Sequence, residues 1–238
     1  MTLFALLHGG LHRGSSWDLV GAELRKRGHH IVQPDIPVDE DAAGAREWAH
    51  CAIDAIDTVT RKADTDVVVV GHSIAGLCLP VVAENRPVRR MVFLAALIPT
   101  PGRSFADHLA ENPGAINFSS FVTTTSGEAG PFGLTWESVR EGFYHDCPEH
   151  LARKAFDDLR GQSFTVFIEK CPIDRWPNTP SSYIVMADDR TLSPKWARRA
   201  AAGLPLAEIH TMRGSHSPFF AQPKALSELL VACCDDQQ

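Results

Sequence analysis

Apolar residues along the chain gather in short, uninterrupted runs that glycine, proline or charged residues end. The runs that we expect to form strands lie at residues 3–7, 31–36, 67–70, 90–98, 182–187 and 206–212. The run at 67–70 consists of four valines, and β-branched side chains suit a pleated strand. A strand without polar alternation is typical of a sheet that is covered on both faces. The pattern therefore predicts a buried, mostly parallel central sheet.

Segments with helical spacing separate these runs. In residues 45–62, Trp48, Ala52 and Ile56 recur four residues apart and share one face of a helix. Other helices are expected at residues 17–27, 74–84, 194–202 and 223–233. Because strands and helices alternate, we predict an α/β fold in which right-handed crossovers place helices on both faces of the sheet.

The alternation of strand and helix is lost in the middle of the chain. Unstructured loops of such length are uncommon inside a domain, so we interpret residues 103–178 as an inserted, mainly helical cap on a core of residues 1–102 and 179–238. Apolar side chains of this cap either pack inside it or wall a substrate pocket. They are Phe118, Phe121, Phe132, Leu134, Trp136, Phe143, Tyr144, Phe164, Phe167 and Trp176.

The composition is that of an ordinary soluble protein. The chain has 238 residues, 44% of them hydrophobic and 22% charged, which fits one large α/β domain with an insertion. A net charge of −6 argues against nucleic acid as a partner, because phosphate binding requires a basic surface. No apolar run approaches the ~20 residues that cross a bilayer, and the first residues do not resemble a secretory signal. We therefore expect no membrane association and a cytoplasmic location.

The cysteines carry no recognisable pattern. None of the six forms a CxxC pair or a His/Cys spacing that is typical of a zinc site. The sequence therefore predicts no metal site and no disulfide scaffold, while it leaves open a pairing of Cys147 with Cys171 within the cap.

The valine run leads into a sharp turn, GHSIAG, at residues 71–76. Ser73 stands there between a strand and a helix, so that its hydroxyl projects from the sheet beside the free N–H groups of a helix N-terminus. The turn departs from strict G-x-S-x-G, because Ala75 occupies the second glycine position and Gly76 follows it. We interpret Ser73 as a nucleophile, and the alternative is a serine that caps an ordinary glycine-rich turn.

Further reactive residues follow the ends of other predicted strands. Ligands of an open α/β sheet bind beyond the carboxyl ends of its strands, so these residues are expected to share a cleft with Ser73. A serine hydroxyl becomes nucleophilic when a neutral imidazole takes its proton, and a carboxylate orients that imidazole. The residues in question are His8, Gly9, Gly10, Asp188, Asp189 and His216.

The chain resembles the α/β-hydrolase superfamily in a series of motifs along nearly its whole length: LLHGG, QPDIP, VVGHSIAG, VFLAALIP, IVMADDRTLSP and GSHSP. It is most similar to the compact subfamily that includes plant methyl-ester hydrolases, such as methyl salicylate esterases, and hydroxynitrile lyases. The resemblance implies Ser73 as nucleophile and His216 as base. It also implies Asp189 as the acid, because this aspartate begins the motif DRTLSP, and an oxyanion hole made by the backbone N–H groups of Gly10 and Ile74.

These residues together predict a serine hydrolase that cleaves carboxylic esters through an acyl-enzyme and needs no cofactor. Methyl or other small esters of a hydrophobic or aromatic acid are the expected substrates, because the cap is rich in apolar residues. The candidates for substrate contact are His12, Phe121, Trp136 and Phe143. The expected partner is thus a small-molecule ester, and the sequence leaves a homodimer open.

Three alternatives to ester hydrolysis stay open. Lactones and thioesters suit the same triad. A hydroxynitrile lyase uses that triad too, but the resemblance implies a threonine and a lysine where this chain has Gly9 and Ser217. A non-catalytic ligand-binding member of the fold would be expected to lack part of the triad, and all three residues are present here.

Overall fold

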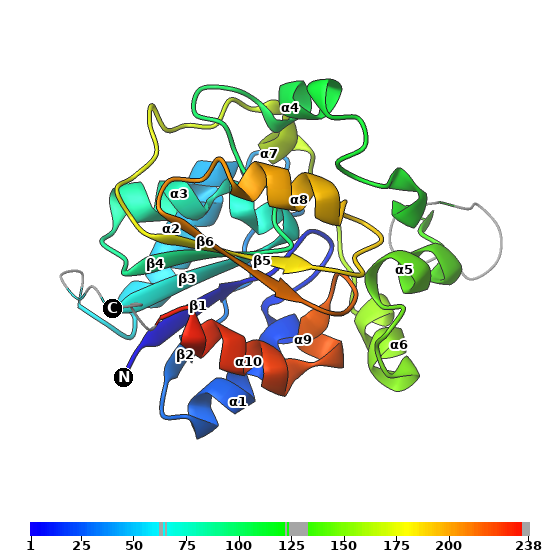
Figure 1. Ribbon diagram of the computed structural model, residues 1–238, viewed down its shortest axis with the longest axis horizontal. Helices are drawn as coiled ribbons and strands as arrows, with labels where there is room; N and C mark the ends of the chain where they lie inside the picture. Colours follow the sequence, from blue (N-terminus) through cyan, green and yellow to red (C-terminus); the bar gives the residue numbers. More distant parts are fainter. Residues whose placement is uncertain (62–63, 65, 122, 124–132, 235–238) are drawn as a thin grey trace.

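Within residues 1–61, 64, 66–121, 123 and 133–234, which the computed structural model describes, six strands form one parallel sheet (Figure 1). The order across the sheet is β2-β1-β3-β4-β5-β6. The strands are β1 (Leu3–Leu7), β2 (His30–Val32), β3 (Val67–His72), β4 (Arg90–Leu94), β5 (Ser181–Met186) and β6 (Ala207–Met212). The α/β-hydrolase fold that the motifs imply is therefore confirmed.

Helices cover both faces of this sheet, as the unbroken apolar runs predict (Figure 1). Val67 and Val69 point into a core on the side of one set of helices, α2 (Ala45–Asp57), α3 (Leu79–Asn85) and α8 (Pro194–Ala201). Val68 and Val70 point to the opposite face, which α1 (Asp18–Lys26), α9 (Pro218–Ala221) and α10 (Pro223–Ala232) cover. All four valines are fully buried, so the strand before Ser73 is anchored by packing from both sides.

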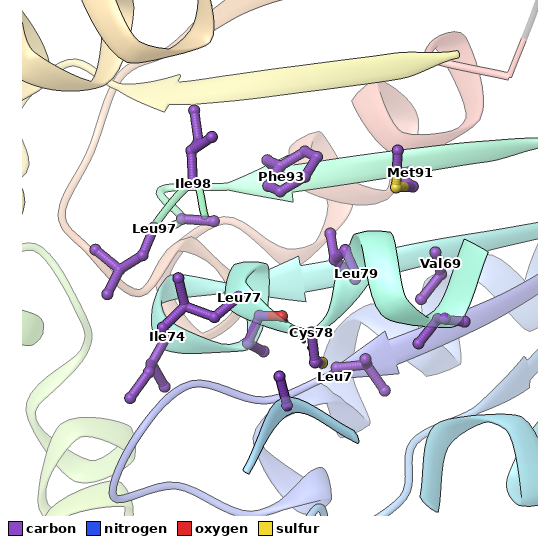
Figure 2. Close-up of a cluster of buried hydrophobic side chains, with 14 of the residues drawn as sticks. Leu7, Val69, Ile74, Leu77, Cys78, Leu79, Met91, Phe93, Leu97 and Ile98 are labelled. Atoms are coloured by element: carbon purple, nitrogen blue, oxygen red, sulfur yellow. Dashed lines mark hydrogen bonds between the residues drawn. The ribbon is translucent and has the colours of Figure 1, made fainter. Parts of the chain in front are cut away.

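Figure 2 shows part of the core that lies between β3, β4 and α3. Apolar side chains from the strands meet those of α3 and of the short 3₁₀ helix η2 (Ser73–Leu77). Ile74 and Leu97 lie together at one end of this cluster, where the strands finish. The hydrophobic core thus extends up to the turn that carries Ser73.

Two predicted strands are shorter in the structure than their apolar runs. The strand expected at residues 31–36 ends at Val32, two residues before Pro34, which has no N–H to give to a ladder. The strand expected at residues 90–98 ends at Leu94, because Ala95 has a φ of 42°, outside the range of extended backbone. Beyond it, the Leu97 N–H donates a hydrogen bond of 2.9 Å to the Ser73 carbonyl oxygen.

The segment between β4 and β5 contains short helices that pack in two groups. They are α4 (Phe105–Glu111), η3 (Phe118–Phe121), α5 (Trp136–Phe143), α6 (Glu149–Asp157) and α7 (Thr165–Ile168). Phe105 of α4 and Val166 of α7 join the core of the sheet, whereas α5 and α6 share a separate apolar cluster near the carboxyl ends of the strands (Figure 1). The separate cluster supports a cap built on α5 and α6, and the boundaries of 103–178 stay a prediction.

The cysteines that the sequence left open as a pair do not pair. Cys147 and Cys171 are both free thiols. Cys147 packs in the cluster of α5 and α6, and Cys171 packs in the core of the sheet domain, so they belong to different apolar clusters. In the described part of the chain, no helix combines the length and the apolar character that crossing a bilayer requires.

Candidate active site

Ser73 occupies a strained turn at the carboxyl end of β3. Its φ of 54° lies in the left-handed region, which residues other than glycine rarely adopt. Such a backbone costs on the order of 1–3 kcal/mol and persists where the surrounding structure enforces it. Here the buried strand β3 precedes Ser73 and η2 starts with it, so the side chain is held at the point where the chain reverses direction.

Residues with little or no side chain let neighbouring backbone approach this turn. A Cβ atom on Gly76 would stand 2.2 Å from the Leu97 carbonyl oxygen, and one on Gly9 would stand 3.1 Å from the Ser73 Cβ. Ala75 is fully buried with its methyl group in place. The residue after Ser73 that the neighbouring backbone approaches too closely for a side chain is therefore Gly76 and not Ala75. This explains why the second glycine of the G-x-S-x-G pattern stands one residue later in this chain.

His216 and Asp189 form a buried pair. His216 lies in the loop between β6 and α9, and Asp189 follows β5. The His216 Nδ1 and the Asp189 Oδ2 are 2.7 Å apart, and both side chains are buried. The other carboxylate oxygen of Asp189 accepts hydrogen bonds from the N–H groups of Thr191 at 2.8 Å and Leu192 at 2.9 Å. Asp189 is thus fixed in the orientation that a carboxylate partner of histidine needs.

The neighbouring Asp188 has a different set of contacts. Its Oδ2 accepts a hydrogen bond from the Gly214 N–H at 2.9 Å and lies 2.9 Å from the Arg213 Nε. These contacts tie the end of β5 to the loop that carries His216. The structure therefore places Asp189 against the imidazole and gives Asp188 a loop-anchoring position.

The turn after β1 lies next to Ser73. A Cβ atom on Gly10 would stand 3.4 Å from the Ile74 Cγ2, so the two residues expected to form the oxyanion hole are neighbours. Leu11 follows with a φ of 65°. Arg160 holds this turn with two hydrogen bonds. Its backbone N–H donates to the Leu11 carbonyl oxygen at 2.8 Å, and its side-chain Nε–H donates to the His12 carbonyl oxygen at 3.0 Å. Within the described part of the chain, no backbone hydrogen bond engages the Gly10 N–H.

Three further histidines surround the site and are buried. The His12 Nδ1 is 2.7 Å from the Gly10 carbonyl oxygen and its Nε2 is 2.6 Å from the Tyr144 hydroxyl. Burial lowers the pKa of His8 to about 3 and the pKa of His12 to about 4, and it holds the pKa of His72 well below its usual range. All three rings are neutral near pH 7, so they add no positive charge to the site.

These depressed pKa values predict that the protein loses stability in mild acid. The unfolded chain binds protons at histidine below about pH 6.5, whereas folded His12 does not until about pH 4. The contribution of these histidines to the free energy of unfolding should therefore be constant above pH 7 and fall between pH 6.5 and 4 by roughly 1.4 kcal/mol per pH unit for each of them.

Urea unfolding measured from pH 8 to pH 5 tests this prediction. His12→Gln should reduce the slope of the free energy against pH, and the same change at the exposed His50 should leave it unaltered. A free energy that stays flat from pH 7 to pH 5 would contradict the buried, neutral state of these rings.

An apolar cavity of about 140 Å³ opens beside Ser73 and His216. Of the predicted contact residues, His12, Phe121 and Phe143 line it. Trp136 does not line the cavity. It is the first residue of α5 and packs on Phe156, with 5.5 Å between the centroids of the two rings. Phe132 lies outside the described residues. The remaining lining residues are Gly10, Leu11, His72, Ile74, Leu97, Ile116, Phe118, Gln162, Phe164, Phe167, Thr191 and Leu192.

Several lining residues were missed by sequence reasoning. Leu97 falls inside an apolar run that reads as a strand, and Thr191 and Leu192 lie in the motif DRTLSP, where only the aspartate attracts notice. Gln162 is in the cap, where no motif marks it. In the part of the chain that the structure describes, no group of three or more His, Cys, Asp or Glu residues could hold a metal ion.

Comparison with known proteins finds relatives that are named as hydrolases and esterases. The pyrethroid hydrolase of Sphingobium wenxiniae is 26% identical over 249 residues, which cover 99% of this chain and 88% of that protein. Putative methylesterase 12, chloroplastic, of Arabidopsis thaliana is 23% identical over an alignment that covers 96% of this chain and 70% of that protein. The crystal structure of polyneuridine aldehyde esterase superimposes on this chain with a TM-score of 0.82 and 18% sequence identity, and the match covers 99% of this chain and 100% of that one. At this identity the match shows a shared fold.

The similarity to a plant methylesterase confirms the resemblance that the motifs indicate. A family model described as "Alpha/beta hydrolase family" matches residues 4–229, nearly the whole chain. The chain belongs to the alpha/beta hydrolase family.

Proposed function

We propose that this protein is a serine hydrolase that cleaves carboxylic esters, with Ser73, His216 and Asp189 as its catalytic triad. The observation that carries the proposal is the buried contact of 2.7 Å between His216 and Asp189, at the cavity that Ser73 and His216 both line. An ester hydrolase is also what the relatives indicate, since several are named as esterases or as a pyrethroid hydrolase.

The reaction proceeds in two steps at Ser73. The Ser73 Oγ attacks the ester carbonyl carbon while His216 takes the hydroxyl proton at Nε2, since Nδ1 faces Asp189. His216 then protonates the departing alkoxide, which leaves an acyl-enzyme on Ser73. Water loses a proton to the same nitrogen, attacks the acyl carbon and releases the acid with Ser73 restored.

The backbone N–H groups of Gly10 and Ile74 stabilise the oxyanion of each tetrahedral intermediate in this proposal. Each donor of this kind is typically worth about 10²- to 10³-fold in rate. Their adjacent positions support this role, as does the Gly10 N–H, which no backbone hydrogen bond engages within the described part of the chain. Arg160 supports the turn from the outside, since it binds the carbonyl groups of Leu11 and His12.

The cavity favours a neutral, apolar substrate of modest size. Among the described residues that line it there is no Lys, Arg, Asp or Glu, so a charged group would lose its hydration without a partner of opposite charge from these residues. Its volume of about 140 Å³ is close to the ~150 Å³ of an apolar cavity that accepts benzene. We therefore propose methyl or other small esters with one aromatic or similarly sized apolar acyl group.

Two other functions are less well supported. A hydroxynitrile lyase needs help for departing cyanide, and neither Gly9 nor the buried Ser217 supplies a cation. A non-catalytic binding protein has no need for the oriented pair of His216 and Asp189. We keep a cytoplasmic location and a possible homodimer as proposals, and the six free cysteines suit a reducing compartment.

A panel of methyl, aryl and thiol esters, lactones and mandelonitrile tests the proposed function. Mass spectrometry should show release of the free acid from methyl or aryl esters of apolar acids, at rates well above the uncatalysed reaction. A colorimetric assay should detect no cyanide from mandelonitrile. Release of cyanide without hydrolysis of any ester would favour the lyase and overturn the proposal.

A further inference from the structure

Two buried histidines contact the pair of glycines in the turn after β1. The His8 Nδ1 lies 2.8 Å from the Gly9 carbonyl oxygen, and the His12 Nδ1 lies 2.7 Å from the Gly10 carbonyl oxygen. A carbonyl oxygen only accepts, so each of these nitrogens carries a proton and donates it. Glycine has no Cβ atom and adopts a wide range of backbone angles, so contacts from outside have to fix this pair.

The second nitrogen of each ring fixes the orientation of that ring. The His8 Nε2 accepts a hydrogen bond from the Ile36 N–H at 3.0 Å. The His12 Nε2 lies 2.6 Å from the Tyr144 hydroxyl oxygen, and Tyr144 donates here because the proton of the neutral ring is on Nδ1. Burial lowers the pKa of His8 to about 3 and the pKa of His12 to about 4, so both rings keep this neutral form near pH 7.

The contact at Gly9 determines the direction of the Gly10 N–H. The peptide bond between the two glycines is trans and planar, so its C=O and N–H groups point in opposite directions. With the Gly9 carbonyl oxygen held by His8, the Gly10 N–H points away from the His8 ring. Gly10 lines the cavity together with Ser73. His12 holds the next carbonyl group, so the peptide planes on both sides of Gly10 are fixed.

Tyr144 connects this turn to the cap. It directly follows α5, and its fully buried ring packs in the apolar cluster of α5 and α6. Its hydroxyl reaches His12, whose side chain lines the cavity. The position of the cap therefore bears on the glycine turn through a single hydrogen bond.

We propose that His8 and His12 are positioning residues of the oxyanion hole. Their Nδ1–H groups fix the two peptide planes beside Gly10 and so aim its N–H at the substrate carbonyl oxygen, while Tyr144 supports His12 from the cap. This inference rests on the proposed function, which assigns the Gly10 N–H to the oxyanion. A whole oxyanion donor is typically worth about 10²- to 10³-fold in rate, and a misaligned donor should lose part of that.

Tyr144→Phe removes the donor to His12 and should lower kcat/KM for p-nitrophenyl acetate about tenfold. Two ketones separate oxyanion alignment from binding. The Ser73 Oγ adds to the carbonyl carbon of benzyl trifluoromethyl ketone and passes its proton to His216, which leaves an oxyanion on the ketone oxygen. The affinity for this ketone should fall by the same factor as kcat/KM. The affinity for benzyl methyl ketone, which binds without addition, should stay within about twofold.

Tyr183→Phe is the matched control. Tyr183 is also fully buried, and its hydroxyl donates a hydrogen bond of 2.7 Å to the Ala96 carbonyl oxygen, outside the glycine turn. This variant should lose a similar free energy of unfolding and keep kcat/KM within about twofold. Equal losses of kcat/KM in the two variants, or equal losses of affinity for the two ketones in Tyr144→Phe, would overturn the inference.

Two variants of His8 test the other contact. Asparagine can present an N–H group near the position of Nδ1, whereas leucine cannot. His8→Leu should lower kcat/KM about 10²-fold, and His8→Asn should regain about tenfold of that loss; the same loss in both would contradict the role of the Nδ1–H group. Should His8→Leu fail to fold, the comparison of Tyr144→Phe with Tyr183→Phe decides. The proposed function fails separately, if hydrolysis of p-nitrophenyl acetate persists in Ser73→Ala.

Discussion

Replacing Ser73 by alanine should lower kcat/KM for ester hydrolysis by about 10⁴-fold or more, with the fold intact. Loss of the nucleophile from a serine hydrolase leaves the contribution of binding and of the oxyanion hole, and this residual rate is small. The substitution removes a single oxygen from a partly exposed side chain, so we expect little change in the thermal unfolding midpoint. Steady-state kinetics with p-nitrophenyl acetate, together with thermal unfolding, check both expectations.

Ser217→Ala is the matched control for this experiment. Ser217 is buried beside His216, and its hydroxyl oxygen has no hydrogen-bond partner among the described residues. Its removal should change kcat/KM by no more than a few fold. Equal losses in the two variants would indicate that a general disturbance of the His216 loop, and not a missing nucleophile, reduces the rate.

Asp189→Asn should lower kcat/KM by about 10³- to 10⁴-fold, whereas Asp188→Asn should change it by no more than a few fold. Asparagine keeps the shape of Asp189 but cannot stabilise the imidazolium of His216 or hold its neutral ring in the required tautomer. The Asp188 carboxylate binds the Gly214 N–H and Arg213, and an amide oxygen can still accept from both. Kinetics of both variants at one pH, with unfolding in urea as a check on stability, measure the difference.

The adjacent positions make this pair of variants informative. The two carboxylates follow the same strand and differ in whether they contact His216. A larger loss in Asp188→Asn than in Asp189→Asn would show that the orientation of the loop, and not the buried contact at His216, controls catalysis.

The strands and the reactive residues at their ends were predictable, because a parallel strand that helices cover on both faces appears in the sequence as an unbroken apolar run. The four valines before Ser73 alternate between two cores, so an unbroken apolar run could only be a buried strand or a buried helix. The ends of these runs were less predictable. Residues beyond Leu94 stay apolar, yet Ala95 turns the chain so that Leu97 packs at the turn that carries Ser73 and lines the cavity.

The cap was predictable in outline and not in detail. An aromatic residue such as Trp136 has the same pattern whether it faces the cavity or, as here, packs on Phe156 of a neighbouring helix. Gln162 carries no local signal, since its position depends on two carbonyl groups, one of them at Val38 far along the chain. Contacts of this kind depend on how the helices pack, which the spacing of residues within one segment does not encode.

The most direct test of the central claim, that Ser73 is the nucleophile, is covalent labelling with a fluorophosphonate. The full-length protein should gain the mass of one phosphonyl group, and peptide mapping should place it on Ser73. The adduct should be absent in Ser73→Ala and should form much more slowly in His216→Gln, because the hydroxyl then has no base. Ester turnover that continues without an adduct, or an adduct on another residue, would contradict this account.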